Sequence, residues 1–127
     1  MQVINRAGPL SVALETTLLV HGVPRGEGLT LAAQLRHDVE SNGATPSVVG
    51  VVAGVPTVGM TDGELGGLLE SPSVPKANTG NLGVLMHRGG HAATTVSTTM
   101  ELAAAAGVRV FATGGLGGLH KGFAQRP

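Results

Sequence analysis

The sequence contains no cysteine, no tryptophan and no tyrosine, and its only aromatic residues are two phenylalanines. Without cysteine, the chain can form neither a disulfide framework nor a thiolate metal site. With so few aromatic rings, a core has to be built from valine, leucine and alanine, with glycine permitting close backbone contact. The absence of cysteine also agrees with a cytoplasmic location.

An excess of charge and a long apolar run are also missing. Eight basic and eight acidic residues give a formal net charge of zero, which argues against an electrostatic interaction with nucleic acid or an anionic membrane. The longest apolar stretch, residues 48–58, is interrupted by Gly50, Gly54 and Pro56 and is too short to span a bilayer. Residues 1–10 lack the apolar region of a signal peptide. We therefore expect a soluble cytoplasmic protein with no nucleic-acid or membrane partner.

The residues that are present indicate one small folded domain. The chain has 127 residues, of which 42% are hydrophobic, and this excludes a disordered chain. Its 21 glycines show no collagen-like period and gather in expected loops.

Hydrophobic patterns predict strands that alternate with helices. We expect strands at residues 11–16, 47–52, 55–58, 74–77 and 108–112. We expect helices from residue 30 to a stop at Asn42-Gly43, from the capping box Thr61–Glu64 to residue 69, and over residues 94–106. This alternation predicts an α/β fold in which helices flank a mainly parallel sheet (α/β/α). Ligands then bind at the carboxyl ends of the strands.

Two features at those carboxyl ends could carry chemistry. A glycine-rich loop, residues 113–118, follows the last expected strand and could approach a phosphate, but its spacing matches neither dinucleotide nor P-loop motifs, so a structural turn is equally plausible. Glu15 ends an apolar strand, where α/β proteins place acid–base groups. By position alone, a solvated carboxylate is the commoner outcome.

Three further groups are weaker candidates. The hydroxyl-rich run at residues 94–99 could bind an anion or a sugar at a helix start, although N-capping with the remaining hydroxyls in solvent is the simpler interpretation. Lys76 could hold a phosphate, although an isolated lysine is more often a surface charge. His87 and His91 are separated by Gly89-Gly90, which argues against a helix that presents both to zinc.

Taken together and in this order, several segments resemble the pseudouridine-5′-phosphate glycosidase, or indigoidine synthase A-like, family. These are residues 12–17 (VALETT), His21-Gly22, residues 42–46 (NGATP), 58–61 (VGMT), 93–96 (ATTV) with Thr99-Met100, and 110–122 (VFATGGLGGLHKG).

The resemblance implies a reversible cleavage of the carbon–carbon glycosidic bond of pseudouridine 5′-phosphate, which gives uracil and ribose 5-phosphate. In this family a lysine attacks the anomeric carbon, a glutamate protonates the base carbon, and manganese helps to organise a homotrimeric enzyme's site. By motif match, Glu15 corresponds to the proton donor, Lys76 to a substrate-binding lysine and Val96 to a substrate-binding residue. Thr113 and His120 are expected to border the same pocket.

Family members are more than twice as long as this chain. We therefore expect residues 1–127 to be the N-terminal part of a single glycosidase domain, with an α/β/α fold that is incomplete relative to the family. The nucleophilic lysine and the manganese-binding aspartate are expected beyond Gly122, so the chain alone should have little activity. Two alternatives stay open: a non-catalytic phosphate- or nucleotide-binding module, and a structural remnant that exposes the strand near residues 48–52 until a partner half covers it.

Overall fold

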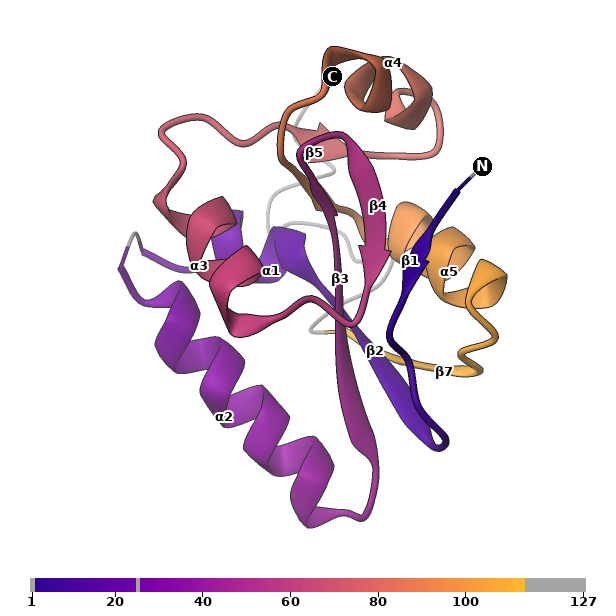
Figure 1. Ribbon diagram of the computed structural model, residues 1–127. Coiled ribbons are helices and arrows are strands. Elements are labelled where there is room, and N and C mark those ends of the chain that lie inside the picture. The colour runs from indigo at the N-terminus through magenta and orange to yellow at the C-terminus, as the bar shows by residue number, and fades with distance from the viewer. Residues whose placement is uncertain (1, 25, 114–127) are drawn as a thin grey trace, which may run out of the picture.

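In the computed structural model, which describes residues 2–24 and 26–113, a mixed β-sheet lies between two layers of helices (Figure 1). The strands are β1 (Ile4–Asn5), β2 (Ser11–Glu15), β3 (Thr45–Val52), β4 (Val55–Val58), β5 (Lys76–Ala77), β6 (Ala92–Thr94) and β7 (Val110–Ala112). The helices are α1 (Thr16–His21), α2 (Gly28–Ser41), α3 (Asp62–Glu70), α4 (Leu82–Arg88) and α5 (Val96–Ala105).

The sheet is mostly parallel, as the alternation of strands and helices predicts. Its main order is β1-β4-β3-β2-β7, with β6 paired to β3 and β5 paired to β6. Four of the six pairings in the described part are parallel, and β3 pairs antiparallel with β4 and β6. The α/β fold class is therefore confirmed.

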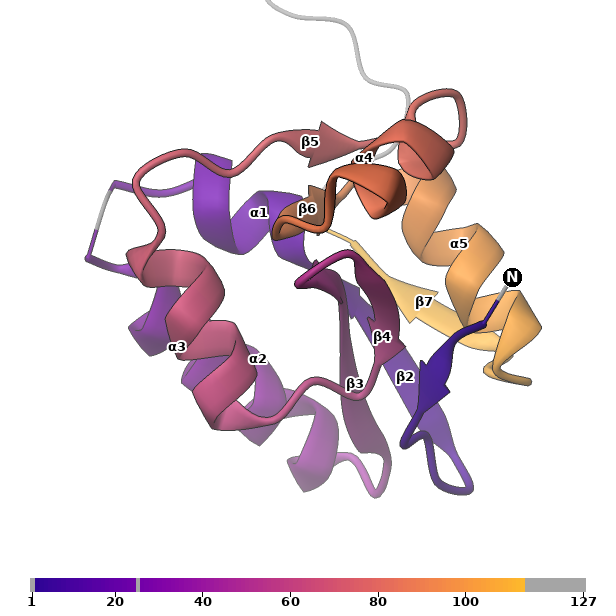
Figure 2. The ribbon, with the colours of Figure 1, turned by 45° about the horizontal axis from the view of Figure 1, so that its top comes forward.

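The two faces of the sheet carry separate apolar cores, and Figure 2 shows α5 on one side of the sheet and α2 and α3 on the other. On one face, Ala13 and Val49 pack with Leu102 and Ala103 of α5. On the other, Leu14 and Val48 pack with residues from α1, α2 and α3. The alternation of Ala13 and Leu14 between the faces follows from the two-residue period of a strand. These two cores make the three layers.

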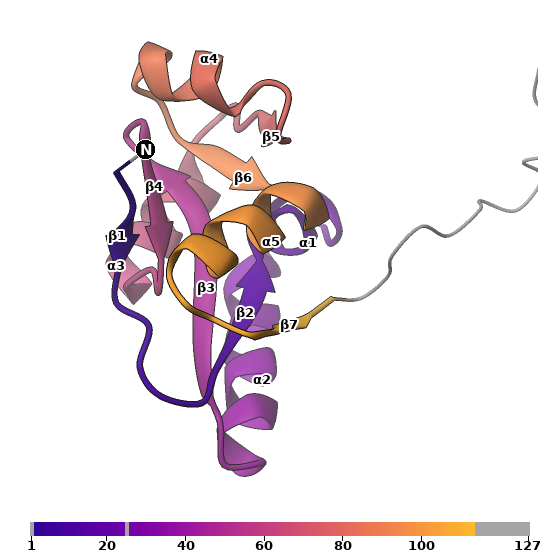
Figure 3. The same ribbon diagram turned by 90° about the vertical axis from the view of Figure 1, so that its right-hand side faces the viewer.

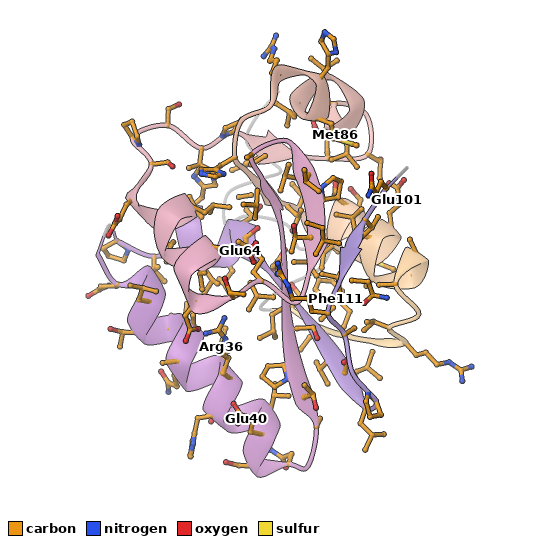
Figure 4. The ribbon with its side chains drawn as sticks, viewed as in Figure 1. Arg36, Glu40, Glu64, Met86, Glu101 and Phe111 are labelled. Atoms are coloured by element: carbon orange, nitrogen blue, oxygen red, sulfur yellow. The ribbon has the colours of Figure 1, made fainter. Side chains whose placement is uncertain are left out.

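The predicted capping box at the start of α3 is confirmed. The Thr61 hydroxyl accepts a hydrogen bond from the Glu64 amide at 3.1 Å, and the Glu64 carboxylate accepts one from the Thr61 amide at 2.9 Å. At the same end of the helix, Asp62 forms an ion pair with Arg36, which Figure 4 shows on α2 beside α3.

Four short elements differ from the prediction. Residues 16–21 form α1 rather than the end of a strand and a loop, β1 and α4 were not predicted, and residues 92–94 form β6, so α5 begins at Val96. Each of these elements has at most seven residues, which is too short for a hydrophobic period to be recognised from sequence alone. Gly89 caps α4 at a φ of +74°, so the helix ends before His91, as expected.

The expected exposed edge at residues 48–52 is wrong. β3 is the central strand, because β4 covers one of its edges while β2 and β6 share the other. Val48, Val49 and Val51 are fully buried. A continuous valine run marks burial on both faces, and here the edges are covered as well.

An ion pair joins the N-terminal segment to the capping box of α3. Arg6 donates to both carboxylate oxygens of Glu64, at 2.6 and 3.2 Å, and Figure 4 shows Glu64 on α3. The hydrogen bond from Arg6 holds the pKa of Glu64 below its ordinary value of 4.5. A carboxyl group whose pKa is lowered by folding adds stability above its unfolded-state pKa, and this stability is lost as pH falls through the folded value.

We therefore predict that Glu64→Gln removes part of the acid sensitivity of this chain. Glutamine keeps the capping-box acceptor but carries no charge, so the change isolates the ion pair. Urea unfolding at about pH 7 and about pH 3 should give a smaller stability difference for the variant than for the parent chain. Equal losses in the two proteins would contradict the prediction.

Candidate functional site

The carboxyl ends of oppositely directed strands meet beside the central strand. β2 pairs in parallel with residues 45–49 of β3, and β6 pairs antiparallel with the following residues, Gly50 and Val51. β2 and β6 therefore run toward each other along the same edge of β3, as Figure 3 shows. β7 is parallel to β2 and β5 is parallel to β6, so their carboxyl ends approach the same region. This is where an α/β fold places ligands.

Glu15 is buried at this junction and accepts a hydrogen bond from Thr113. Its side chain is only 9% exposed, and its Oε1 accepts from the Thr113 hydroxyl at 2.7 Å. Glu15 is the last residue of β2 and Thr113 follows β7, the strand paired to β2. Thr113 therefore lies beside Glu15, and Glu15 is not a solvated surface carboxylate.

Buried threonines join the end of β2 to the end of β6. The Thr94 amide donates to the Thr16 hydroxyl and the Thr17 hydroxyl donates to the Thr94 carbonyl, each at 2.8 Å. The Thr94 hydroxyl donates to the Val49 carbonyl and accepts from Thr99 of α5, also at 2.8 Å each. Because Thr16 follows Glu15 directly, these bonds fix the position of Glu15 relative to the first turn of α5.

The hydroxyl run at residues 94–99 is therefore mostly internal. Thr94, Thr98 and Thr99 are fully buried, and Thr98 donates to the Ala77 carbonyl at 2.7 Å. Thr95 stands at the N-cap of α5 but makes no side-chain cap hydrogen bond, and its hydroxyl donates to Ala77 instead. The expectation that one of these residues caps the helix while the other hydroxyls face solvent is therefore wrong.

Lys76 lies on β5, whose two backbone carbonyls accept hydrogen bonds from different neighbouring segments. Its carbonyl accepts from the Asn81 side chain at 3.0 Å, and the next carbonyl, of Ala77, accepts from the amide of Thr95. The side chain of Lys76 is exposed, and no ion pair of Lys76 is found among the described residues. These backbone hydrogen bonds place Lys76 near the start of α5, and its side chain is exposed to solvent.

Val96 is the first residue of α5 and is half-buried. The first N–H groups of a helix have no intrahelical partner, and the helix dipole makes this end attractive to anions and carbonyl oxygens. Its backbone is therefore suited to contact a ligand at the strand ends.

The structure does not bring all the candidate site residues close to one another. Lys76 pairs with Ala93, so it lies on the face of the sheet that packs against α1, α2 and α3. Glu15 lies on the same face as Ala13, which is the face that packs against α5. No contact between Lys76 and Glu15 is found in the described part. The loop after Thr113 and His120 lie outside the described residues. A cavity of about 500 Å³ lies elsewhere, at the amino ends of β2 and β7.

The residues that position Glu15 could not be identified from the sequence. Thr16 was expected to end a strand, but its buried hydroxyl accepts from Thr94, and Gly50 leaves room beside it, because a Cβ there would lie 3.3 Å from the Thr16 methyl group and 2.7 Å from the Met60 sulfur. The only sequence signal was the pair Thr16-Thr17 directly after Glu15. Hydroxyl pairing between residues 78 positions apart leaves no local pattern.

No group of three histidine or acidic side chains in residues 2–24 and 26–113 could hold a metal ion. At the strand ends Glu15 is a single carboxylate that accepts from a hydroxyl. These residues do not form a manganese site by themselves.

A model of the family described as "Indigoidine synthase A like protein" matches residues 2–126. The chain belongs to the indigoidine synthase A-like family. The family resemblance inferred from the sequence motifs is thus confirmed.

Curated members of the family carry the name pseudouridine-5′-phosphate glycosidase. One from Saccharopolyspora erythraea is 45% identical over 118 residues, which are 93% of this chain and 39% of that protein. One from a Roseiflexus species is 46% identical over 119 residues, which are 91% of this chain and 38% of that protein. The chain thus spans under two fifths of the length of these relatives.

Solved structures of the family share the fold. An indigoidine synthase A-like protein from Thermotoga maritima superposes with a TM-score of 0.84 at 32% identity, over 93% of this chain and 41% of that one. A prealnumycin C-glycosynthase, crystallised with ribulose 5-phosphate, superposes with a TM-score of 0.75 at 32% identity, over 87% of this chain and 35% of that one. In the described part of our chain, no helix is both long and apolar enough to cross a bilayer.

Proposed function

We propose that this chain is part of an enzyme that reversibly cleaves the carbon–carbon glycosidic bond of pseudouridine 5′-phosphate, giving uracil and ribose 5-phosphate. The observation that carries the proposal is the buried Glu15, which accepts a hydrogen bond from a hydroxyl group at the carboxyl ends of the strands. It does so in a chain 45% identical to a pseudouridine-5′-phosphate glycosidase over 93% of its length. A structural relative named as a C-glycosynthase, with a bound pentulose phosphate, supports the same class of substrate.

In this proposal Glu15 supplies the proton that the reaction needs. The bond that breaks leaves its electrons on a uracil carbon, which has no lone pair, so a proton must be delivered to that carbon as it leaves. The Thr113 hydroxyl donates to Oε1 and orients the carboxyl group, which leaves Oε2 to face the leaving base. In the reverse direction the same carboxylate accepts the proton from uracil.

Lys76 and Val96 would bind the remainder of the substrate. The base and the phosphate of pseudouridine 5′-phosphate stand at opposite ends of the ribose, so the acid and the phosphate ligand need not touch each other. The Lys76 ammonium is suited to the phosphate as a compact point charge. The Val96 amide, at the start of α5, is suited to a substrate oxygen.

The other parts of the proposal rest on the family. When bound, manganese would supply a positive charge that organises the substrate oxygens, and its aspartate ligand, like the nucleophilic lysine, is proposed to come from the part of the fold that this chain does not span. A trimeric, cytoplasmic enzyme belongs to the same proposal.

A chimera tests the function. This chain would replace its matched segment in the Saccharopolyspora erythraea glycosidase, with which it shares 45% identity over 118 residues. Incubated with manganese and pseudouridine 5′-phosphate, the chimera should release uracil and ribose 5-phosphate, whereas the chain alone should release neither. A folded chimera without activity would overturn the proposal, and robust turnover by the chain alone would overturn the expected need for the remainder.

A further inference from the structure

The strand ladder is interrupted where β2 and β6 meet head to head along β3 (Figure 3). Ala93 of β6 pairs with Gly50, so the next residue, Thr94, would stand opposite Val49 if the ladder continued. Val49, however, is already paired with Glu15, the last residue of β2. Among the described strands, none is left to pair with the backbone of Thr94 on this edge.

The backbone of Thr94 faces this interruption at a fully buried position. On the other edge of β6, the β5 segment accepts hydrogen bonds from the amides on either side of Thr94, those of Ala93 and Thr95. Successive amides of a strand point to opposite edges, so the Thr94 amide points away from β5. A buried backbone group without a partner is costly, so Thr94 needs a donor and an acceptor from another element.

Two consecutive hydroxyl groups supply these partners. Thr16 accepts from the Thr94 amide and Thr17 donates to the Thr94 carbonyl, each at 2.8 Å. Thr94 thus receives the pair of bonds that a neighbouring strand would give it, although Thr16 and Thr17 open the helix α1. Thr16 is fully buried, and its methyl group lies beside Gly50, where a Cβ would come within 3.3 Å of it. Side chains therefore join the end of β2 to the end of β6 where strand pairing stops.

This connection spans two parts of the proposed site. Glu15 directly precedes Thr16, and Thr94 stands two residues before Val96, whose amide is the proposed contact for a substrate oxygen. Proton transfer requires the acid to lie within about 2.6–3.2 Å of the accepting atom. A misplacement of about 1 Å reduces a rate by about 10²-fold. The two hydroxyl bonds thus lie on the shortest described connection between the acid and the start of α5.

We propose that Thr16 and Thr17 are positioning residues for cleavage of the carbon–carbon bond. Their hydroxyls hold Glu15 at the distance from the start of α5 at which its proton reaches the leaving base carbon. Neither hydroxyl contacts the substrate, and each acts through Glu15. The assignment rests on the proposed function and adds that the acid is placed by bonds to Thr94 as well as by its own strand.

Thr17→Val in the chimera described above tests the assignment. Valine has nearly the shape of threonine but cannot donate to the Thr94 carbonyl. We expect kcat for pseudouridine 5′-phosphate to fall about tenfold or more while KM changes by about threefold or less, because Lys76 and Val96 are unchanged. Thr17→Ser keeps the donor and should restore kcat to within about threefold of the parent chimera. Thr17→Ala removes the same hydroxyl with a residue that favours helices, so it replaces the valine variant if valine prevents folding.

A double variant separates positioning from stability. If Thr17 acts through Glu15, its hydroxyl has no effect on turnover once the acid is absent. The combination of Glu15→Gln with Thr17→Val should therefore turn over within about twofold of Glu15→Gln alone. Ser11→Ala is the matched control, because it removes a buried hydroxyl at the other end of β2, where it donates to the Gly8 carbonyl at 2.6 Å. This control should keep kcat within about twofold of the parent chimera.

Three results would overturn the assignment while the parent chimera is active, so the proposed function would stand. The first is a parent-like kcat in a folded Thr17→Val or Thr17→Ala chimera, which would mean that the bond to Thr94 does not place the acid. The second is a loss from Thr17→Val that multiplies with the loss from Glu15→Gln. The third is an equal loss in Ser11→Ala, which would show that any missing buried hydroxyl slows the enzyme. A folded but inactive parent chimera would overturn the proposed function and this assignment with it.

Discussion

Glu15→Gln lowers the turnover of pseudouridine 5′-phosphate by the chimera about 10²- to 10⁴-fold, the range expected for the loss of a positioned general acid. Glutamine has the size of glutamate and keeps an oxygen that accepts from Thr113, which lies 2.7 Å from Oε1 in the parent chain. It carries no acidic proton, so only proton delivery is removed. We expect kcat to fall while KM changes by about threefold or less, since the proposed phosphate ligand, Lys76, is unchanged.

The matched control is Glu101→Gln on α5. Glu101 is exposed on its helix, where Figure 4 labels it, and its replacement makes the same change in charge without touching the strand ends. Steady-state assays of uracil release should show control activity close to that of the parent chimera. If Glu15→Gln keeps more than about a tenth of the parent turnover, Glu15 is not the proton donor.

Thr94→Val destabilises the chain by about 2–4 kcal/mol, because it leaves buried hydrogen-bonding groups without a partner. Valine has nearly the shape of threonine, so the core stays filled. The Val49 carbonyl loses a donor and the Thr99 hydroxyl loses an acceptor, both at fully buried positions. For a chain of this size, the thermal midpoint measured by circular dichroism should fall by about 10 °C or more.

Two further variants separate the hydroxyl from other effects. Thr94→Ser keeps the hydroxyl and loses one buried methyl group, which costs about 1 kcal/mol. Thr30→Val makes the same chemical change at an exposed position of α2 and should leave stability within about 0.5 kcal/mol of the parent. A serine variant as unstable as the valine variant would show that the hydrogen bonds of Thr94 do not stabilise the junction.

The elements that were predicted correctly are those with a strong local signal. β3 follows from its valine run, β4 from the turn that precedes it, and α3 from a capping box whose two bonds both form. The start of β7 was placed two residues too early, at Val108 instead of Val110. Periodicity and capping depend on neighbouring residues, so they can be read without knowledge of the fold.

The elements that were missed depend on distant partners. β6 has three residues, and its pairing with β3 and β5 gives it the form of a strand. α1 follows Glu15 without a side-chain cap, so no start signal marks it. The sequence suggested a continuous strand there, because threonine and valine favour strands when only local propensity is considered.

By itself, the sequence determined the fold class and the family, since hydrophobic periods and family motifs are written along the chain. Tertiary structure alone decided that Thr113, from the far end of the chain, donates to Glu15, and that buried threonines tie β2 to α5. It also decided that both edges of β3 are covered by other strands. The physical reason is the same in each case: hydrogen bonds and strand pairings join residues far apart in sequence, and such partners are specified only when the whole sheet has assembled.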